Sequence, residues 1–262
     1  IVLALAFIRW ERSTEYPMLP IDLFSKMGFT MGLVAISLAF FVMFSFMFTQ
    51  MLHFQLVRGH TALEAAIRFL PLPLGLMPAA ANSDKFVAKF GSNNVVATGL
   101  TLITAGMLLF TTVEIDTDYV RIALTFFMLG LGMGLTMAPS TTLVMESIPE
   151  DKAGVGSATN DASREIGGAL GIAIGGSVLN EYYQRNLVVP EGLDSSGLTE
   201  SFPTAMRIGL ELMADGNMLG AELIANARLA FMDGMVASAM VSAGIALMTA
   251  ILVKLYMPGK TE

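Results

Sequence analysis

The sequence has 262 residues, 54% hydrophobic and 14% charged, with a formal net charge of −7 and no cysteine. Soluble globular domains carry about 25% charged residues, so this composition indicates an all-α membrane protein with several spans. The lack of cysteine excludes disulfides and cysteine-ligated metals, and with two histidines we expect no metal site. Nucleic-acid binding is not expected either, because no basic patch with interleaved aromatic residues occurs.

The chain opens with an apolar octet, residues 1–8, followed by Arg9, Trp10 and Arg12. Eight residues are too few to span a bilayer, and tryptophan and arginine are typical of the membrane interface. We interpret 1–8 as the end of a transmembrane helix that starts upstream. Residues 9–26, which are polar, are then expected to form a cytoplasmic connector.

Six apolar segments of spanning length follow, and they predict a six-helix domain over residues 27–257. The expected spans are approximately 27–57, 62–81, 95–113, 119–147, 154–180 and 230–256.

Polar segments separate these spans. We expect a loop over 82–94, an external loop over about 184–228 with short amphipathic helices near 204–213 and 218–231, and a cytoplasmic tail over 258–262. Lysine and arginine favour the side that holds both chain ends, which predicts that this side is cytoplasmic.

The first span carries a seam of side chains at four-residue spacing, and one helix face can present all of them. The seam comprises Ser37, Phe41, Ser45 and Thr49, with Gln50 beside it. One interpretation is hydrogen bonding between helices of this domain. The other is the wall of a substrate cavity, because aromatic rings offer apolar area and can bind cations.

The fifth span combines charges with closely spaced glycines. Asp161, Arg164 and Glu165 share one face, and charges inside a span usually face protein or a water-filled pathway. With Glu146 at the end of the fourth span, they are candidates for coupling or gating. The alternative is that they only anchor the cytoplasmic end of the helix.

Glycines in the same two spans predict close helix packing, because a missing side chain lets another backbone approach. Pro139 is expected to kink the fourth span. The predicted packing positions are Gly130, Gly134, Pro139, Gly167, Gly168, Gly171 and Gly175.

Two stretches carry a resemblance to a known family: GLGMGLTMAPSTTLVMESIPEDKAGVGSATNDASREIGGALGIAIGGSVL, residues 130–179, and RGHTALEAAIRFLPLPLGLMPA, residues 58–79. They resemble the C-terminal half of a bacterial major facilitator superfamily transporter, in the 14-helix drug:proton antiporter branch. The superfamily's loop motif is only partly matched, by Asp84, Lys85, Lys89 and Gly91. No enzyme motif such as HExxH or GxSxG occurs, so an enzyme is not expected.

The resemblance implies proton-coupled efflux of several drugs by alternating access in the bacterial cytoplasmic (inner) membrane. The energy source would be the proton gradient, with no cofactor. The expected partners are the lipid bilayer, an N-terminal half of the same transporter and amphipathic small molecules. Two alternatives stay open: a major facilitator transporter for another small solute, and a truncated membrane protein that does not transport.

Overall fold

The computed structural model describes residues 6, 9–11, 13–14, 20–193 and 197–259. The expected helix end at 1–8 lies outside these residues apart from position 6. Residues 260–262 of the expected tail also lie outside them. The described residues form helices joined by turns, without a strand. In chain order they are η1 (Ile21–Ser25), α2 (Met27–Leu52), the π-helical η2 (His53–Val57), α3 (Ala62–Ile67), α4 (Pro71–Phe90), α5 (Ser92–Phe110), α6 (Tyr119–Glu146), η3 (Glu150–Lys152), α7 (Ala153–Asn186), α8 (Phe202–Ala214) and α9 (Leu219–Tyr256).

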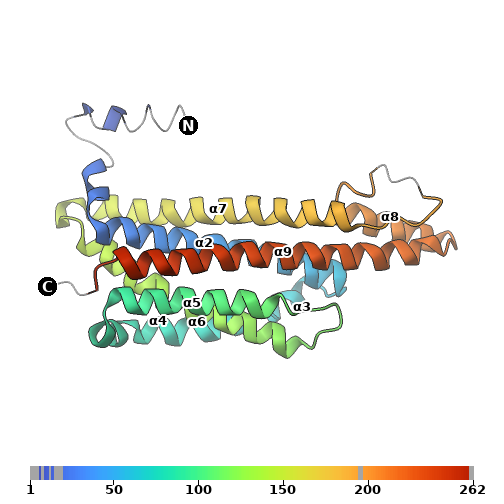
Figure 1. Ribbon diagram of the computed structural model, residues 1–262, viewed down its shortest axis with the longest axis horizontal. Coiled ribbons are helices and arrows are strands. Elements are labelled where there is room, and N and C mark those ends of the chain that lie inside the picture. The colour runs from blue at the N-terminus through green and yellow to red at the C-terminus, as the bar shows by residue number, and fades with distance from the viewer. Residues whose placement is uncertain (1–5, 7–8, 12, 15–19, 194–196, 260–262) are drawn as a thin grey trace.

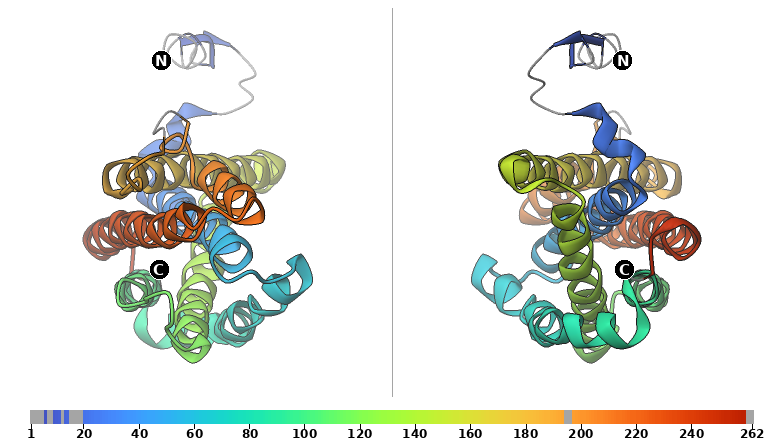
Figure 2. Two further views of the ribbon diagram at one scale, coloured as in Figure 1. Left: turned by 90° about the vertical axis from the view of Figure 1, so that its right-hand side faces the viewer. Right: turned by 90° about the vertical axis from the view of Figure 1, so that its left-hand side faces the viewer.

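The long helices run side by side along the long axis of the molecule (Figure 1). In that view α7, α2 and α9 lie above α4, α5 and α6, and the two groups meet where α2 contacts α6 and where α9 contacts α5. The end-on views in Figure 2 show the same bundle along its axis. The short α8 packs on α9 at the end of the bundle opposite the C-terminus.

Five helical segments of the described chain are long and apolar enough to cross a membrane: Met27–Val57, Ala62–Phe90, Ser92–Phe110, Tyr119–Glu146 and Leu219–Tyr256. The glycine-rich, charged α7 is not among them, although its 34 residues would extend about 50 Å at 1.5 Å per residue. It packs lengthwise against both α2 and α9. The chain is therefore an all-α membrane protein, as the sequence predicted.

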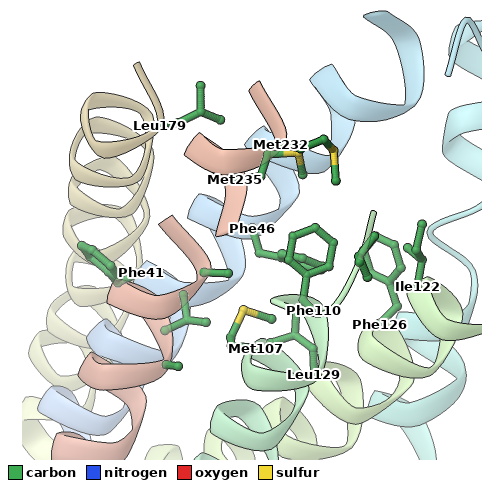
Figure 3. Close-up of a cluster of buried hydrophobic side chains, with 14 of the residues drawn as sticks. Phe41, Phe46, Met107, Phe110, Ile122, Phe126, Leu129, Leu179, Met232 and Met235 are labelled. Atoms are coloured by element: carbon green, nitrogen blue, oxygen red, sulfur yellow. The ribbon is translucent and has the colours of Figure 1, made fainter. Parts of the chain in front are cut away.

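An aromatic and methionine-rich core joins the two helix groups. Figure 3 shows the Phe46 ring of α2 pointing toward Phe110 of α5 and Phe126 of α6, while Phe41 lies on the other side of α2, toward α7. The centroid of Phe46 is 5.0 Å from that of Phe110 and 5.2 Å from that of Phe126. Edge-to-face and tilted contacts of this kind favour one defined packing arrangement.

Two predicted loop segments are helical. Residues 82–90 continue α4, and only Gly91 interrupts the chain before α5 begins at Ser92. Gly91 has φ +84°, which favours glycine, and Ser92 N–H donates to the Gly259 carbonyl at 2.8 Å. In the same way 218–231 is not a separate amphipathic helix, because nearly all of it forms the first turns of α9, whereas α8 covers the predicted helix at 204–213. Polar composition marks where a helix leaves lipid, not where the helix ends.

The two ends of the bundle differ in charge. Lys26, Lys85, Lys89, Lys152 and Lys254 lie at the end with Gly91 and Gly259, and the opposite end carries Glu114, Asp116 and Asp118 together with Arg58, Arg68 and Arg121. Lys26 also ties this end together, because its Nζ donates to the Ser147 carbonyl at 2.7 Å.

This charge difference leads to a topology prediction. Single substitutions Lys85→Cys and Glu114→Cys place one thiol on an exposed residue at each end, with no other cysteine in the chain. If the lysine-rich end is cytoplasmic, an impermeant maleimide added to intact cells should label position 114 and spare position 85 until the cells are opened. Labelling of position 85 alone in intact cells would reverse the orientation.

Candidate functional site

The glycines of α7 form its contact with α2. Gly167, Gly171 and Gly175 are buried four residues apart, and each faces one residue of α2: Ser37, Phe41 and Ser45 in turn. At the first two positions a Cβ atom would collide with a backbone carbonyl oxygen, and at the third with the Ser45 hydroxyl. The two four-residue repeats therefore interlock, and α7 lies as close to α2 as backbones allow.

Most of the seam predicted on α2 is buried, because part of it faces these glycines of α7. The side chains of Phe41, Ser45, Thr49 and Gln50 are buried among the helices of this chain, and Ser37 keeps partial exposure. The Ser45 and Ser238 hydroxyl oxygens are 3.4 Å apart, which links α2 to α9. The burial of these four side chains agrees with the packing interpretation of the seam.

Gln50 and Thr49 form local hydrogen bonds at the C-terminal end of α2. The Thr49 hydroxyl donates to the Phe46 carbonyl at 3.0 Å, and Gln50 Oε1 lies 3.1 Å from Nδ1 of the buried His53. His53 opens the π-helical turn η2, and such turns often occur where a helix must keep a functional or packing geometry.

An aromatic row that the sequence reading missed lies beside the seam. Phe40, Phe44 and Phe48 are also spaced four residues apart, and Phe44 and Phe48 keep 37% and 38% of their surface exposed. The Phe40 and Phe44 rings stack with centroids 6.0 Å apart. The Phe44 and Phe48 rings lie over Gly168 and Gly176 of α7, where a Cβ would come within 3.2 and 3.3 Å of them. The four-residue phenylalanine spacing was the available signal.

Arg164 of α7 lies at one end of this row and connects three helices. Its guanidinium carbon is 5.7 Å from the centroid of Phe40 on α2. One terminal nitrogen is 3.5 Å from Asp161 Oδ1, the other donates to the Thr141 hydroxyl of α6 at 3.5 Å, and the buried Nε has no partner among the described atoms. With 30% of its side chain exposed, Arg164 is held by long, weak contacts and retains donor capacity for another group.

Of the other predicted charges, Asp161 reaches Arg164, whereas Glu165 and Glu146 form no ion pair with it. Asp161 is 65% exposed, and Glu165 and Glu146 are exposed, with no ion pair to either among the described residues. Of the partly matched loop motif, Asp84, Lys85 and Lys89 lie on the last turns of α4 as exposed side chains, next to Gly91.

The predicted packing glycines of α6 contact α4. Gly130 faces the Leu72 carbonyl, and Gly134 faces the Leu76 carbonyl and Ala79. The buried Pro139 lies inside α6, which stays helical through it. Close glycine contacts thus join two helix pairs of the bundle, α7 with α2 and α6 with α4.

Comparisons with known proteins agree with this architecture. The family model Major Facilitator Superfamily matches residues 7–172. The multidrug efflux pump LfrA of Mycolicibacterium smegmatis is 29% identical over 256 residues, which cover 97% of this chain and 50% of LfrA. The multidrug transporter protein MdtP of Bacillus subtilis is 30% identical over 178 residues, 67% of this chain and 32% of MdtP. The tetracenomycin C resistance and export protein of Streptomyces glaucescens is 28% identical over 172 residues, 66% of this chain and 32% of that protein.

The chain thus spans about half the length of LfrA and about a third of the other two relatives. The named relatives are transporters and export proteins, not enzymes. The family match covers more than half of the chain, and the described residues include five helical segments long and apolar enough to cross a membrane. This protein therefore belongs to the major facilitator superfamily.

Proposed function

We propose that this chain is one half of a proton-coupled exporter of amphipathic drugs in the bacterial cytoplasmic membrane. It would act with a second six-helix half, the two halves rocking about a midplane site to give alternating access. Support comes from the drug exporters among its relatives and from its match to half the length of LfrA. The proton gradient would supply the energy, and small amphipathic molecules and the lipid bilayer would be the partners.

The single observation that carries the proposal is the half-exposed row Phe40, Phe44 and Phe48 with Arg164 at its end. Aromatic faces attract both apolar and cationic groups, so such a surface suits drugs that combine the two. The row lies one residue before the predicted seam Phe41, Ser45 and Thr49, whose side chains are buried. We therefore assign substrate contact to the exposed row and packing to the seam.

Substitution of the row tests this assignment. In the full-length protein, Phe44→Ala and Phe48→Ala should each reduce resistance to cationic amphipathic drugs, while changing resistance to uncharged ones less. Removing one ring that faces a cation should weaken the binding free energy by about 1 kcal/mol, which is roughly fivefold in affinity. The measurement is the inhibitory concentration of several chemically distinct drugs in cells that lack other pumps, at matched protein level.

Phe86→Ala is the matched control. Phe86 is similarly exposed, but it lies on α4 and borders a different surface with Val95 and Leu135. It should leave the resistance profile intact. If both row variants kept the full profile while being produced normally, the row would not contact substrate.

A further inference from the structure

A polar cavity of about 440 Å³ lies at the end of the bundle opposite the lysine-rich end. It forms where the chain leaves η2, enters α3 and α4, and returns from the 111–118 segment into α6. Neither the aromatic row on α2 nor Arg164 on α7 lines this cavity. Its lining residues are Phe54, Arg58, His60, Arg68, Asp116, Thr117, Asp118, Tyr119 and Ile122.

The lining carries two cations and two anions that do not pair with each other. Arg58 Nη2 donates to the Thr117 carbonyl at 2.6 Å, and Arg68 Nη1 donates to the Glu64 carbonyl at 3.0 Å. Among the described residues no carboxylate oxygen lies within 4.0 Å of either guanidinium. Arg58 Nε is buried and has no hydrogen-bond partner in the part of the chain that the structure describes. Opposite charges that face one cavity without touching leave room for a ligand between them.

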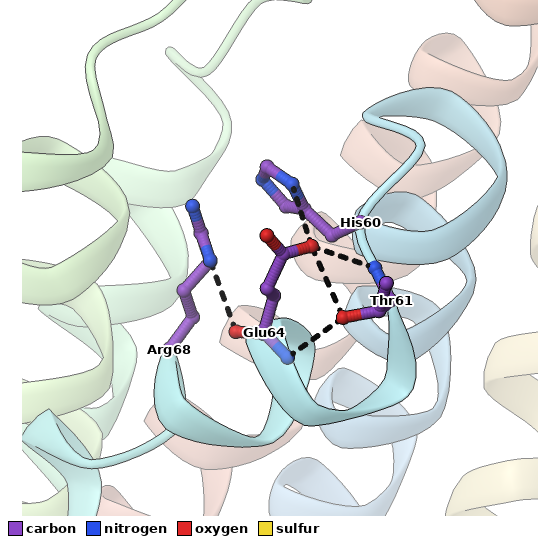
Figure 4. Close-up of polar contacts among 4 residues, drawn as sticks. All are labelled: His60, Thr61, Glu64 and Arg68. Atoms are coloured by element: carbon purple, nitrogen blue, oxygen red, sulfur yellow. Dashed lines mark hydrogen bonds and ion pairs between the residues drawn. The ribbon is translucent and has the colours of Figure 1, made fainter.

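The cationic side of the cavity is held in place by local contacts. Figure 4 shows Arg68 and His60 extending to the same side of α3, with Glu64 between them. Thr61 and Glu64 bond each other reciprocally at the start of α3, with Thr61 N–H to Glu64 Oε2 at 2.8 Å. The Tyr119 hydroxyl donates to the Arg68 carbonyl at 2.9 Å, and the Arg68 guanidinium lies 5.8 Å from the Tyr119 ring centroid.

His60 adds polarity without charge at neutral pH. Burial, followed by the nearby positive charge of Arg68, lowers its pKa from the usual 6.5, against a smaller opposing effect of Glu64. Burial also lowers the pKa of Arg58, and Asp116 partly offsets this. At pH 7 the cavity therefore presents Arg58 and Arg68 against Asp116 and Asp118, a balanced set of charges.

The surface beside the cavity is exposed and apolar, as a surface that faces lipid would be. Leu63, Ile67 and Leu70 on α3 and the turn after it are 71%, 53% and 54% exposed, and they precede the apolar α4. Two helical segments that are long and apolar enough to cross a membrane begin at Ala62 and at Tyr119, which is where lipid headgroups are expected if both cross it. A ligand with a charged head and apolar tails fits this position better than a fully soluble one.

We propose that this cavity binds the headgroup of a phospholipid that carries both a phosphate and a primary ammonium. The phosphate would lie at Arg58 and Arg68, since guanidinium groups bind phosphate through paired donors. The ammonium would lie at Asp116 and Asp118, and the acyl chains along Leu63 and Ile67. The 111–118 segment and the α3 end of the domain are then held together by the lipid as well as by Arg58 and Thr117.

Lipid retention by the purified full-length protein tests the proposal. The protein is exchanged into micelles with equal amounts of phosphatidylethanolamine, phosphatidylglycerol and phosphatidylcholine, and bound lipid is counted by native mass spectrometry. The wild type should retain phosphatidylethanolamine about threefold or more above phosphatidylglycerol, as partly exposed charge pairs allow. Arg68→Gln should lower the retention of every phospholipid.

The double variant Asp116→Asn with Asp118→Asn separates the headgroup from general lipid binding. It should lose the preference for phosphatidylethanolamine and keep phosphatidylglycerol at the wild-type level. Arg121→Gln is the control, because Arg121 lies at the same end but does not line the cavity. A wild type without preference, or a double variant that keeps it, would overturn the proposal. Binding of soluble glycerophosphoethanolamine by a protein that retains no phospholipid would reject the lipid and assign the free headgroup.

Discussion

Gly171→Leu should abolish most of the folded protein recovered from membranes. Gly171 is buried on α7, and even a Cβ atom there would collide with the Phe41 carbonyl of α2. That carbonyl is backbone and cannot move aside as a side chain can, so a leucine must force α7 away from α2 along the whole glycine contact. Overpacking in a well-packed core costs about 1–3 kcal/mol and occasionally more. We expect at least a fivefold loss of monodisperse protein in fluorescence-detected size-exclusion chromatography.

Gly244→Leu is the matched control for this substitution. Gly244 lies within α9, and nothing comes within 4 Å of the position that its Cβ would occupy. Its neighbours Met240, Leu247 and Met248 are exposed, which places it on the surface that would face lipid. A leucine there should leave the yield unchanged. Equal losses at positions 171 and 244 would mean that the added side-chain bulk itself, not the contact with α2, lowers the yield, because leucine favours a helix more than glycine does.

The glycine contact was accessible from sequence because its signal is strictly local. Gly167, Gly171 and Gly175 recur every four residues, and the absence of side chains at that spacing has one main structural use inside a membrane. The partner helix was not accessible, because several helices of the bundle carry small residues. In the structure the partner helix is α2, whose Ser37 and Phe41 carbonyls face the glycines of α7.

The orientation of α2 about its own axis was the harder problem. Its apolar residues surround the helix, so the sequence offers no strong contrast between faces, and Phe40 and Phe41 are adjacent positions about 100° apart. The polar seam through Ser45 and Thr49 allowed two interpretations, hydrogen bonding between helices and a cavity wall. In a membrane protein, small hydroxyl side chains serve equally well in helix contacts, and Ser45 meets Ser238 there.

The pattern of apolar residues also did not predict where the helices end, because several helices continue beyond their apolar segments. The last turns of α4 carry Asp84, Lys85 and Lys89, and the first turns of α9 carry Glu222 and Arg228. These residues leave the membrane while remaining helical, so the change in polarity and the end of the helix fall at different positions. The contacts of Arg164 with Asp161 and Thr141 depend on side-chain rotamers, which composition does not determine.

Arg164→Gln should reduce proton-driven drug export at least about tenfold, equivalent to about 1.4 kcal/mol, while leaving folded protein in the membrane. Arg164 of α7 contacts Phe40 of α2 and Thr141 of α6, and it lies beside the exposed aromatic row of the proposed function. Glutamine keeps donors for the Thr141 hydroxyl but removes the charge that faces Asp161 and the Phe40 ring. Because those contacts are long and partly exposed, their loss should cost little stability.

Transport in everted vesicles, measured against an imposed proton gradient, separates a role in the pathway from an anchoring role. Arg164→Lys should restore much of the activity if positive charge is what matters, and Asp161→Asn should lower export of all substrates to a similar degree if Asp161 shares in coupling. Arg185→Gln is the control, because Arg185 pairs with Glu181 on the exposed surface near the other end of α7. Wild-type export by both Arg164→Gln and Asp161→Asn would show that these charges only anchor the helix, and the coupling residues would then have to be sought elsewhere in the transporter.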